Sequence, residues 1–427
     1  MNRKIFLSFL GTNNYEKCVY SYKEYQSAVV RFVQSALIDM CCKEWDNDDK
    51  ILIFTTEDAL NKNWKKLEQE CQTRISLKNI DIPNGKNEEE IWKIFDIIYN
   101  QLENNDELYV DITHSFRSIP LLAASLLQYA KSLKNISVQA IYYGAFDNLG
   151  NARDIKTRIP NPNNRIAPIF NLTAFSEIQD WSVAANDFIC YGNTQRLCAL
   201  IKNNIKPVLR QTQIENNAAR NLNTLNKQIK NVSLNIRTNR GKEIIKGKAP
   251  KDIIDILDSL ETDLILITPL NPILEKLKES IQKIYKGEND TKNMLAAVEW
   301  CIEKQLIQEG FTLLQEGIIS FLLKDDDYSN KDKRNFTSNF LNTFYSKGKE
   351  FDRHKNNNLS DKDIEILEES LKSLEECQAL CNLFRKITEM RNDINHAGTS
   401  SQSLSADVFE KKLKNLFKQM KELIDPC

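Results

Sequence analysis

The sequence predicts an α/β Rossmann-like domain over residues 1–170, an all-α connector over 171–290 and an all-α C-terminal domain over 291–427. Three observations predict this organisation. The chain has 427 residues, about three times the length of a common domain. Runs rich in β-branched and aromatic residues alternate with amphipathic runs as far as residue 160, which is typical of a parallel sheet with crossover helices. Beyond Asn171 the strand patterns end and helical periodicity takes over.

The first domain is expected to contain four strands and four helices. The strand patterns cover Lys4–Leu10, Lys50–Thr55, Leu108–Ile112 and Val138–Tyr143, and the helical patterns cover Tyr22–Met40, Trp64–Cys71, Glu88–Leu102 and Ser118–Leu133. The apolar run from Ile5 to Leu10 is shorter than the apolar region of a signal peptide, so we expect a buried strand in a cytoplasmic protein. No apolar run approaches the roughly 20 residues of a membrane-spanning helix, and no membrane association is expected.

The rest of the chain is expected to be helical. Ile253, Ile256 and Leu260 recur at helical spacing. Gly398 is a natural helix terminator and marks the end of a long helical pattern. The expected elements of the last domain are a long apolar-periodic helical stretch over Asn293–Leu323, a polar loop over 324–363, and two helices over about Asp363–His396 and Ala406–Leu423.

Charge, glycine and cysteine content exclude several classes of protein. The 58 Lys and Arg residues nearly balance the 59 Asp and Glu residues, which excludes a generally basic nucleic-acid coat protein. Only 12 glycines are present, which disfavours a dinucleotide dehydrogenase or a P-loop enzyme. The ten cysteines are scattered and only three histidines are available, so we expect reduced thiols and no metal site.

The segment from Pro207 to Lys251 departs from the charge balance. It carries ten Lys and Arg residues against Glu215 and Glu243 alone. These cations could line a path for RNA through phosphate contacts, which position a strand without reading its sequence. The alternative is a solvated face of a helical connector.

The first candidate site is the carboxyl edge of the predicted sheet. Ligands of such sheets bind beyond the strand ends, where this sequence has small polar residues at Gly11–Asn14, Thr55–Glu57, Thr113–Ser118 and Gly144–Phe146. The run Asp111–Ser118 joins a strand to a helix start, where N–H groups, hydroxyls and an arginine can bind a phosphate. The alternative is that Thr113 or Ser115 only caps the helix and that His114 is an interior histidine.

The second candidate site is the run Arg391–His396 near a helix end. At 100° per residue its two end residues lie about 140° apart around the helix, so a single copy makes a poor catalytic site. Two copies facing each other across a two-fold axis would combine two His and two Arg. Such a site suits metal-independent RNA cleavage by the ribose 2′-hydroxyl, because His transfers protons and Arg stabilises the phosphorane. The alternative is a surface helix end where Arg391 pairs with Glu389 or Asp393.

Taken together, these segments resemble the CRISPR-associated ancillary ribonucleases of type III systems, which join a CARF sensor domain to a HEPN nuclease domain. The subgroup that the chain resembles most is the TM-type CARF proteins. The Asp-Ile-Thr-His-x-Phe-Arg-Ser run is the most distinctive part, and the resemblance spans nearly the whole chain. The segments that carry it are Phe9–Asn13, Phe54–Glu57, Asp111–Pro120, Ile141–Gly144 and Arg391–His396.

The resemblance implies a homodimer, or a higher oligomer, in which a bound cyclic oligoadenylate switches on cleavage of single-stranded RNA by paired HEPN domains in antiviral defence. The implied activator is cyclic tetra-adenylate, with cyclic hexa-adenylate as second choice, and no cofactor is implied for catalysis. Arg391 and His396 are the implied catalytic residues, supported by Asn392. The CARF domain could also cleave its activator slowly. The residues implied to bind the ring are Gly11, Thr12, Asn13, Thr55, Thr113, His114, Ser115, Phe116, Arg117, Ser118 and Gly144.

Two other functions stay open. The chain could be a ligand-gated regulator that controls a partner or DNA, for which Lys411, Lys412, Lys414 and Lys418 supply a modest basic cluster. It could also be a helical scaffold with an inert nucleotide-binding half. The Arg391 and His396 pair argues against the scaffold.

Overall fold

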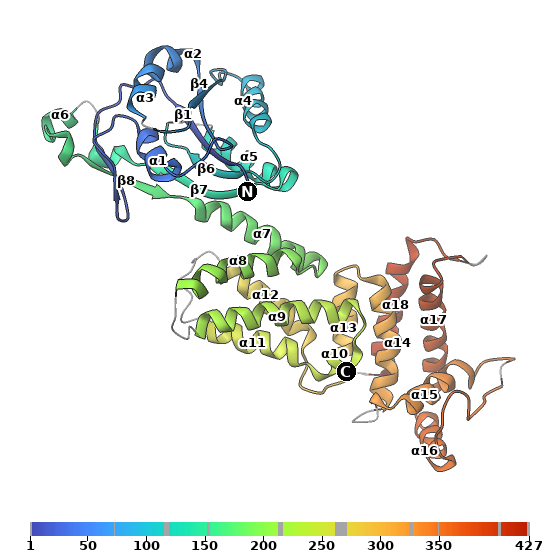
Figure 1. Ribbon diagram of the computed structural model, residues 1–427. Coiled ribbons are helices and arrows are strands. Elements are labelled where there is room, and N and C mark those ends of the chain that lie inside the picture. Colours follow the sequence, from blue (N-terminus) through green and yellow to red (C-terminus); the bar gives the residue numbers. More distant parts are fainter. Residues whose placement is uncertain are drawn as a thin grey trace. The chain divides into compact units, whose positions relative to one another are not determined.

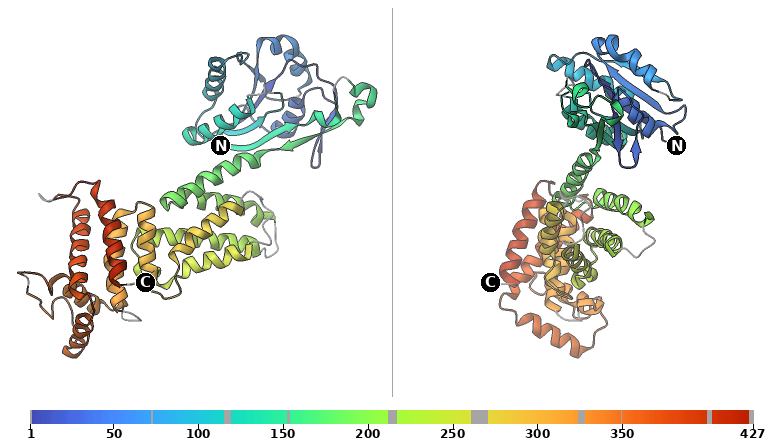
Figure 2. Two further views of the ribbon diagram at one scale, coloured as in Figure 1. Left: turned by 180° about the vertical axis from the view of Figure 1, so that it is seen from behind. Right: turned by 90° about the vertical axis from the view of Figure 1, so that its left-hand side faces the viewer.

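The computed structural model describes residues 2–71, 73–114, 119–151, 154–211, 217–260, 271–323, 328–348, 350–399 and 403–424. The chain divides into two compact units, Met1–Gln179 and Asp180–Cys427. The first is an α/β unit and the second is helical, as the ribbon in Figure 1 and the further views in Figure 2 show. The predicted fold class is therefore confirmed.

The first unit is built on an eight-stranded sheet, counted over the described residues, with the order β3-β2-β8-β7-β6-β1-β4-β5. All neighbouring strands are parallel except the pairs β2–β3 and β7–β8. In β1 every residue after Lys4 is buried, as expected for a central strand covered on both faces. The strands are β1 Lys4–Leu10, β2 Val19–Tyr22, β3 Tyr25–Gln26, β4 Lys50–Thr55, β5 Leu77–Asp81, β6 Glu107–Asp111, β7 Ser137–Gly144 and β8 Ile166–Asn171.

Helices cover both faces of the sheet, and a hydrophobic core lies under each layer (Figure 1). Leu37 of α1 and Leu67 of α3 contribute to one core, and Ile94 of α4 and Leu126 of α5 to the other. The helices are α1 Val33–Cys42, α2 Glu57–Ala59, a π-helix at Leu60–Trp64, α3 Lys65–Glu70, α4 Glu88–Gln101, α5 Ile119–Lys134 and α6 Ile155–Arg158; 3₁₀ turns lie at Phe146–Leu149 and Pro162–Asn164.

Several predicted elements match closely. The structure confirms the strands at Lys4–Leu10 and Lys50–Thr55 residue for residue, and the helix expected at Glu88–Leu102 ends one residue earlier. Asn87 explains its start, because the Asn87 side chain accepts a hydrogen bond from the Glu90 N–H at 2.9 Å.

The helix predicted over Tyr22–Met40 is wrong in its first half. Strands β2 and β3 form a hairpin there, with Lys23 at φ 53° in the turn. The backbones of Cys18 and Val30 then pair, and α1 begins only at Val33. Pairing of β2 with β8, about 145 residues further along the chain, overrides the local helical pattern.

The second unit consists of packed helices in its described part, so the prediction that strands end near Asn171 is confirmed. Helix α7 crosses the boundary between the units. Trp300, Phe311 and Phe384 are among the large side chains that fill the core of the second unit. The helices are α7 Thr173–Tyr191, α8 Gln195–Gln211, α9 Asn217–Arg237, α10 Gly241–Lys246, α11 Lys248–Leu260, α12 Asn271–Ile284, α13 Lys292–Glu303, α14 Ile307–Leu323, α15 Lys331–Thr343, α16 Asp361–Lys372, α17 Cys377–Asn395 and α18 Val408–Ile424.

Two predictions for the last helices are wrong. The expected polar loop over 324–363 contains α15, because Phe336 and Phe340 lie one turn apart and are both fully buried. The single helix expected over about Asp363–His396 is divided into α16 and α17 by a turn after Lys372. Among the described helices, none has both the length and the apolar content needed to cross a membrane.

Candidate functional site

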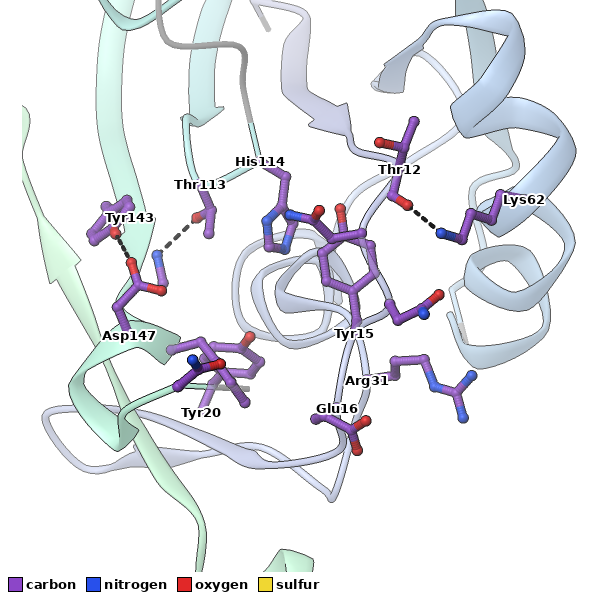
Figure 3. A pocket seen from close by; sticks show the side chains of 15 residues that line it. Thr12, Tyr15, Glu16, Tyr20, Arg31, Lys62, Thr113, His114, Tyr143 and Asp147 are labelled. Atoms are coloured by element: carbon purple, nitrogen blue, oxygen red, sulfur yellow. Dashed lines mark hydrogen bonds between the residues drawn. The ribbon is translucent and has the colours of Figure 1, made fainter. Parts of the chain in front are cut away.

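The carboxyl ends of β1, β6 and β7 meet around a cavity of about 710 Å³, which we call cavity 1. It lies at the ends of the neighbouring strands β1 and β6. The helix after β1, α1, and the helix after β6, α5, cover opposite faces of the sheet, and ligands usually bind at such a position. Figure 3 shows how the side chains converge on it. The lining residues are Thr12, Asn13, Asn14, Tyr15, Glu16, Tyr20, Arg31, Lys62, Thr113, His114, Tyr143, Gly144, Phe146, Asp147 and Asn151.

The loop after β1 is held from outside the sheet by the π-helix. The Lys62 ammonium donates to the carbonyl of Thr12 at 2.6 Å, a bond drawn in Figure 3. The Asn63 amide donates to the carbonyls of Gly11 and Asn13 at 2.9 and 3.0 Å. Short π-helical turns are frequent at functional sites, and this one fixes the backbone of the residues expected to contact a ligand.

Asp111 and Thr113 connect the ends of the central strands. The Thr113 hydroxyl donates to Asp111 Oδ1 at 2.5 Å and accepts from the Gly144 N–H at 2.8 Å. Ser8 of β1 donates to the other oxygen of Asp111 at 2.7 Å. Burial raises the pKa of Asp111 above its ordinary value. The hydroxyl of Thr113 therefore positions β6 against β7 and is already committed to two protein groups.

His114 lies inside the wall of cavity 1. Its ring centroid is 4.4 Å from that of Tyr15, and its Nε2 atom is buried without a hydrogen-bond partner among the described residues. Burial lowers the pKa of His114 to about 4, so the imidazole is neutral at pH 7. A buried ring nitrogen without a partner is costly unless a ligand or water supplies one, which is consistent with a binding cavity.

Two glycines of the site are required by packing. A Cβ atom on Gly144 would collide with the Val33 side chain and lie 3.1 Å from Tyr20 Cε1. One on Gly11 would lie 2.5 Å from the Tyr15 hydroxyl oxygen. At both glycines, the space that a Cβ atom would need is therefore occupied by a side chain of the protein itself.

The structure brings most of the expected ring-binding residues together. Thr12, Asn13, Thr113, His114 and Gly144 line cavity 1, and Gly11 lines an adjoining cavity of about 230 Å³. The expected residues Ser115, Phe116, Arg117 and Ser118 lie outside the described residues.

Thr55 is the exception among the expected ring-binding residues and lines none of the cavities described. Its side chain is fully buried, and its hydroxyl donates to Asn79 of β5 at 2.6 Å, which corrects the expectation that it faces a ligand. Its neighbour Thr56 lines the smaller cavity instead. The sequence also gave no signal for Tyr15, Arg31 and Lys62, because they come from segments that only the fold brings to the strand ends.

The expected catalytic residues lie at the end of α17. Arg391 is half-buried, and its Nε atom has no partner among the described residues. His396 is exposed at the C-cap of α17, where its backbone N–H donates to the backbone carbonyl of Asn392 at 2.8 Å. The alternative ion pairs do not form within the described part of the chain, since Asp393 instead accepts from the Leu404 N–H at 2.9 Å.

The basic segment is divided over α8 to α11. Lys246, Lys248 and Lys251 form ion pairs with Glu243, Asp252 and Glu288, respectively. On α9 the four cations Arg220, Lys227, Lys230 and Arg237 are exposed, and that helix contains no carboxylate.

The cysteines within the described ranges are free thiols. No group of three or more His, Cys, Asp or Glu side chains that could hold a metal ion occurs among the described residues.

Comparison with known proteins places the site in a family context. Residues 5–147 match the family model of the CARF domain of the CRISPR system endoribonuclease Csx1. Residues 177–291 match the second domain of the CRISPR-associated protein MJ1674. The first unit therefore contains a CARF domain. Cavity 1 and its surrounding strand ends belong to that CARF domain, apart from Asn151.

Two individual proteins are similar to this CARF protein. The CRISPR-associated protein MJ1674 of Methanocaldococcus jannaschii is 25% identical over 268 residues, which cover 61% of this chain and 36% of that protein. The chain therefore spans little more than a third of that relative's length. A solved structure of Enterococcus italicus Csm6 bound to cyclic hexa-2′-fluoro-hexa-dAMP aligns over 99% of this chain and 94% of that chain, with 13% identity and a TM-score of 0.40.

Proposed function

We propose that the protein is a metal-independent endoribonuclease of type III CRISPR defence, activated when its CARF domain binds a cyclic oligoadenylate. The observation that carries this proposal is cavity 1, which lies at the strand ends of a domain that matches the CARF domain of an endoribonuclease. Cyclic tetra-adenylate is the preferred activator and cyclic hexa-adenylate the alternative.

Cavity 1 has properties suited to a nucleotide. Its volume of about 710 Å³ falls within the range of small-molecule sites. The imidazole of His114 and the ring of Tyr15, tilted by 45° to each other, offer aromatic groups for contact with a base, and the backbone of the loop after β1 is fixed by Asn63. A ring lying on a two-fold axis would contact two such cavities alike, so we propose a homodimer as the functional unit.

The effector in this proposal is a HEPN domain over residues 291–427, and its catalytic residues are Arg391 and His396, supported by Asn392. One copy presents His396 at an exposed helix end, and the buried Nε of Arg391 is unpartnered among the described residues. Two copies would supply the imidazole that removes the 2′-hydroxyl proton and the guanidinium that stabilises the phosphorane. The RNA would then be cleaved by its own ribose oxygen.

The deciding experiment measures cleavage of a labelled single-stranded RNA that contains all four bases, with EDTA present. Cyclic tetra-adenylate and cyclic hexa-adenylate are added in turn to wild type, His396→Ala and Arg391→Gln. We expect ring-dependent cleavage by wild type and a loss of at least about 100-fold in either variant, the size typical of removing a catalytic proton-transfer group.

His354→Ala is the matched control, because His354 is exposed and its imidazole lies 3.4 Å from the exposed Asp361, outside the proposed catalytic residues. It should cleave like wild type. Cleavage that persists in His396→Ala contradicts the catalytic assignment. Ring binding without cleavage would favour the other candidate function, a ligand-gated regulator that acts on a partner or on DNA.

A further inference from the structure

A second cavity, which we call cavity 2, shares a wall with cavity 1. It has a volume of about 630 Å³, and Asn14, Tyr15, Glu16 and Arg31 line both. In Figure 3 Arg31 lies across cavity 1 from Tyr143, and its side chain extends away from His114. Neither the matched family nor the motifs of the sequence assign a ligand to cavity 2.

The two cavities differ in charge. The wall of cavity 1 has two cations, Arg31 and Lys62, and two carboxylates, Glu16 and Asp147, so its described charges balance. The wall of cavity 2 has five cations and one carboxylate, Glu16, so its described charge is +4. The five cations are Lys17, Arg31, Lys66, Lys156 and Arg165.

Arg165 places a permanent charge in the wall of cavity 2. It is 3% exposed, and its guanidinium donates only to the carbonyls of Ile159, Lys17 and Pro160, at 2.7, 3.2 and 3.1 Å. No carboxylate among the described side chains pairs with it. A buried guanidinium that is hydrogen-bonded but not neutralised produces a strong local positive potential.

The charged side-chain groups of three more cations of cavity 2 form no ion pair within the part of the chain that the structure describes: Lys17, Arg31 and Lys66. The backbone N–H of Arg31 donates to the Glu70 carboxylate at 2.9 Å, which leaves its guanidinium free for a ligand. Lys156 is paired, at 3.0 Å, with Glu16. Unpaired cations around a concave site repel one another unless an anion is bound. Phosphate suits them best, because arginine and lysine bind its oxygens through charge-assisted hydrogen bonds.

We propose that cavity 2 is a phosphate subsite that binds a phosphate group of the nucleotide whose base and ribose occupy cavity 1. This inference rests on the proposed function and names the part of the ligand that each cavity takes. The phosphate is either a phosphodiester of a cyclic oligoadenylate or the terminal phosphate of a linear one. Arg31 borders both cavities and joins the two parts of the site.

The test measures the Kd of cyclic tetra-adenylate, and of linear tetra-adenylate with and without a 5′-phosphate, for wild type, Arg31→Gln and Lys66→Gln. Each variant should weaken binding of the phosphate-bearing ligand by about tenfold. The slope of the logarithm of the binding constant against the logarithm of the salt concentration should fall by about one for each lost contact. Loss with the cyclic ligand indicates a phosphodiester, and loss confined to the 5′-phosphorylated linear ligand indicates a terminal phosphate.

Lys65→Gln and Arg74→Gln are the matched controls, since both residues are exposed and neither lines the cavities described. Both should bind within twofold of wild type. Arg165 is left unchanged because it holds three backbone carbonyls and its loss would disturb folding. If wild type binds the nucleotides and Arg31→Gln/Lys66→Gln binds equally well, the phosphate subsite is refuted.

A second measurement keeps the subsite testable if wild type binds none of these nucleotides, which would refute the proposed function itself. The melting temperature of the full chain is then measured with and without inorganic tripolyphosphate. A stabilisation that is present in wild type and in Lys65→Gln, but lost in Arg31→Gln/Lys66→Gln, supports an anion subsite alone. No stabilisation of wild type refutes the subsite as well.

Discussion

His114 shows how burial sets the chemistry of a single residue in the CARF domain. A histidine beside a candidate phosphate-binding loop suggests a cationic ligand group, but the structure places the ring against Tyr15 with its Nε2 buried. Desolvation then favours the neutral form. Charge for an anionic ligand must come from other residues, and the cations of cavity 2 can supply it.

The lowered pKa of His114 predicts an acid-sensitive first unit. In the unfolded chain the histidine takes up a proton below pH of about 6.5, whereas in the folded unit it does so only near pH 4. Stability is therefore lost as the pH falls through this window. From pH 7 to pH 5 the free energy of unfolding of wild type should fall by about 2 kcal/mol more than that of His114→Gln.

Urea titrations at the two pH values, followed by fluorescence of the first unit, measure this difference. The same replacement at the exposed His354 is the control and should leave the pH dependence unchanged. If the free energy of unfolding falls equally in wild type and in His114→Gln, His114 is protonated as readily in the folded unit as in the unfolded chain.

At the scale of elements, the π-helix at Leu60–Trp64 determines the shape of the ligand loop. The sequence predicts a helix that starts at Trp64, and neither the extra turns before it nor their contacts with the loop are visible in a local pattern. Asn63 is 3% exposed and donates to the carbonyls of Gly11 and Asn13. Its amide joins two segments that are about 50 residues apart.

Replacement of Asn63 by Ala should therefore reduce ring binding, because Asn63 holds the loop after β1 and also lines cavity 2. The part-buried hydrogen bonds to the carbonyls of Gly11 and Asn13 are lost, at a cost of about 1–3 kcal/mol each if no water replaces the donor, and the loop becomes free to move. We expect at least a tenfold weaker Kd for cyclic tetra-adenylate. Asn61→Ala on the same π-helix is the control, because Asn61 is exposed. Unchanged affinity in Asn63→Ala would show that the loop does not depend on this contact.

At the scale of the whole molecule, the proposed function requires that a signal passes from a cavity in one unit to a helix end in the other. Coupling between two binding sites is reciprocal: if the ring raises affinity for RNA, RNA raises affinity for the ring by the same factor.

The variant His396→Ala, which by the proposed function should not cleave RNA, allows this prediction to be tested at equilibrium. Fluorescence anisotropy gives the Kd for labelled RNA with and without cyclic tetra-adenylate, and then the Kd for the ring with and without RNA. Both ratios should be equal and about five- to 150-fold, the usual range for coupled sites. Ratios of one in both directions would mean that the ring controls catalysis without changing RNA affinity.

The sequence by itself determined the α/β class of the first unit, the strands β1 and β4, the helical second unit and the short polar segments at the strand ends. These features follow from local periodicity and from the rule that ligands bind at the carboxyl ends of parallel strands. Only the tertiary structure decided the pairing of β2 with β8, the place of Thr55 against Asn79, and the meeting of Arg31, Lys66 and Arg165 around cavity 2. These depend on pairing and burial between residues that are distant in the chain, which no local pattern encodes.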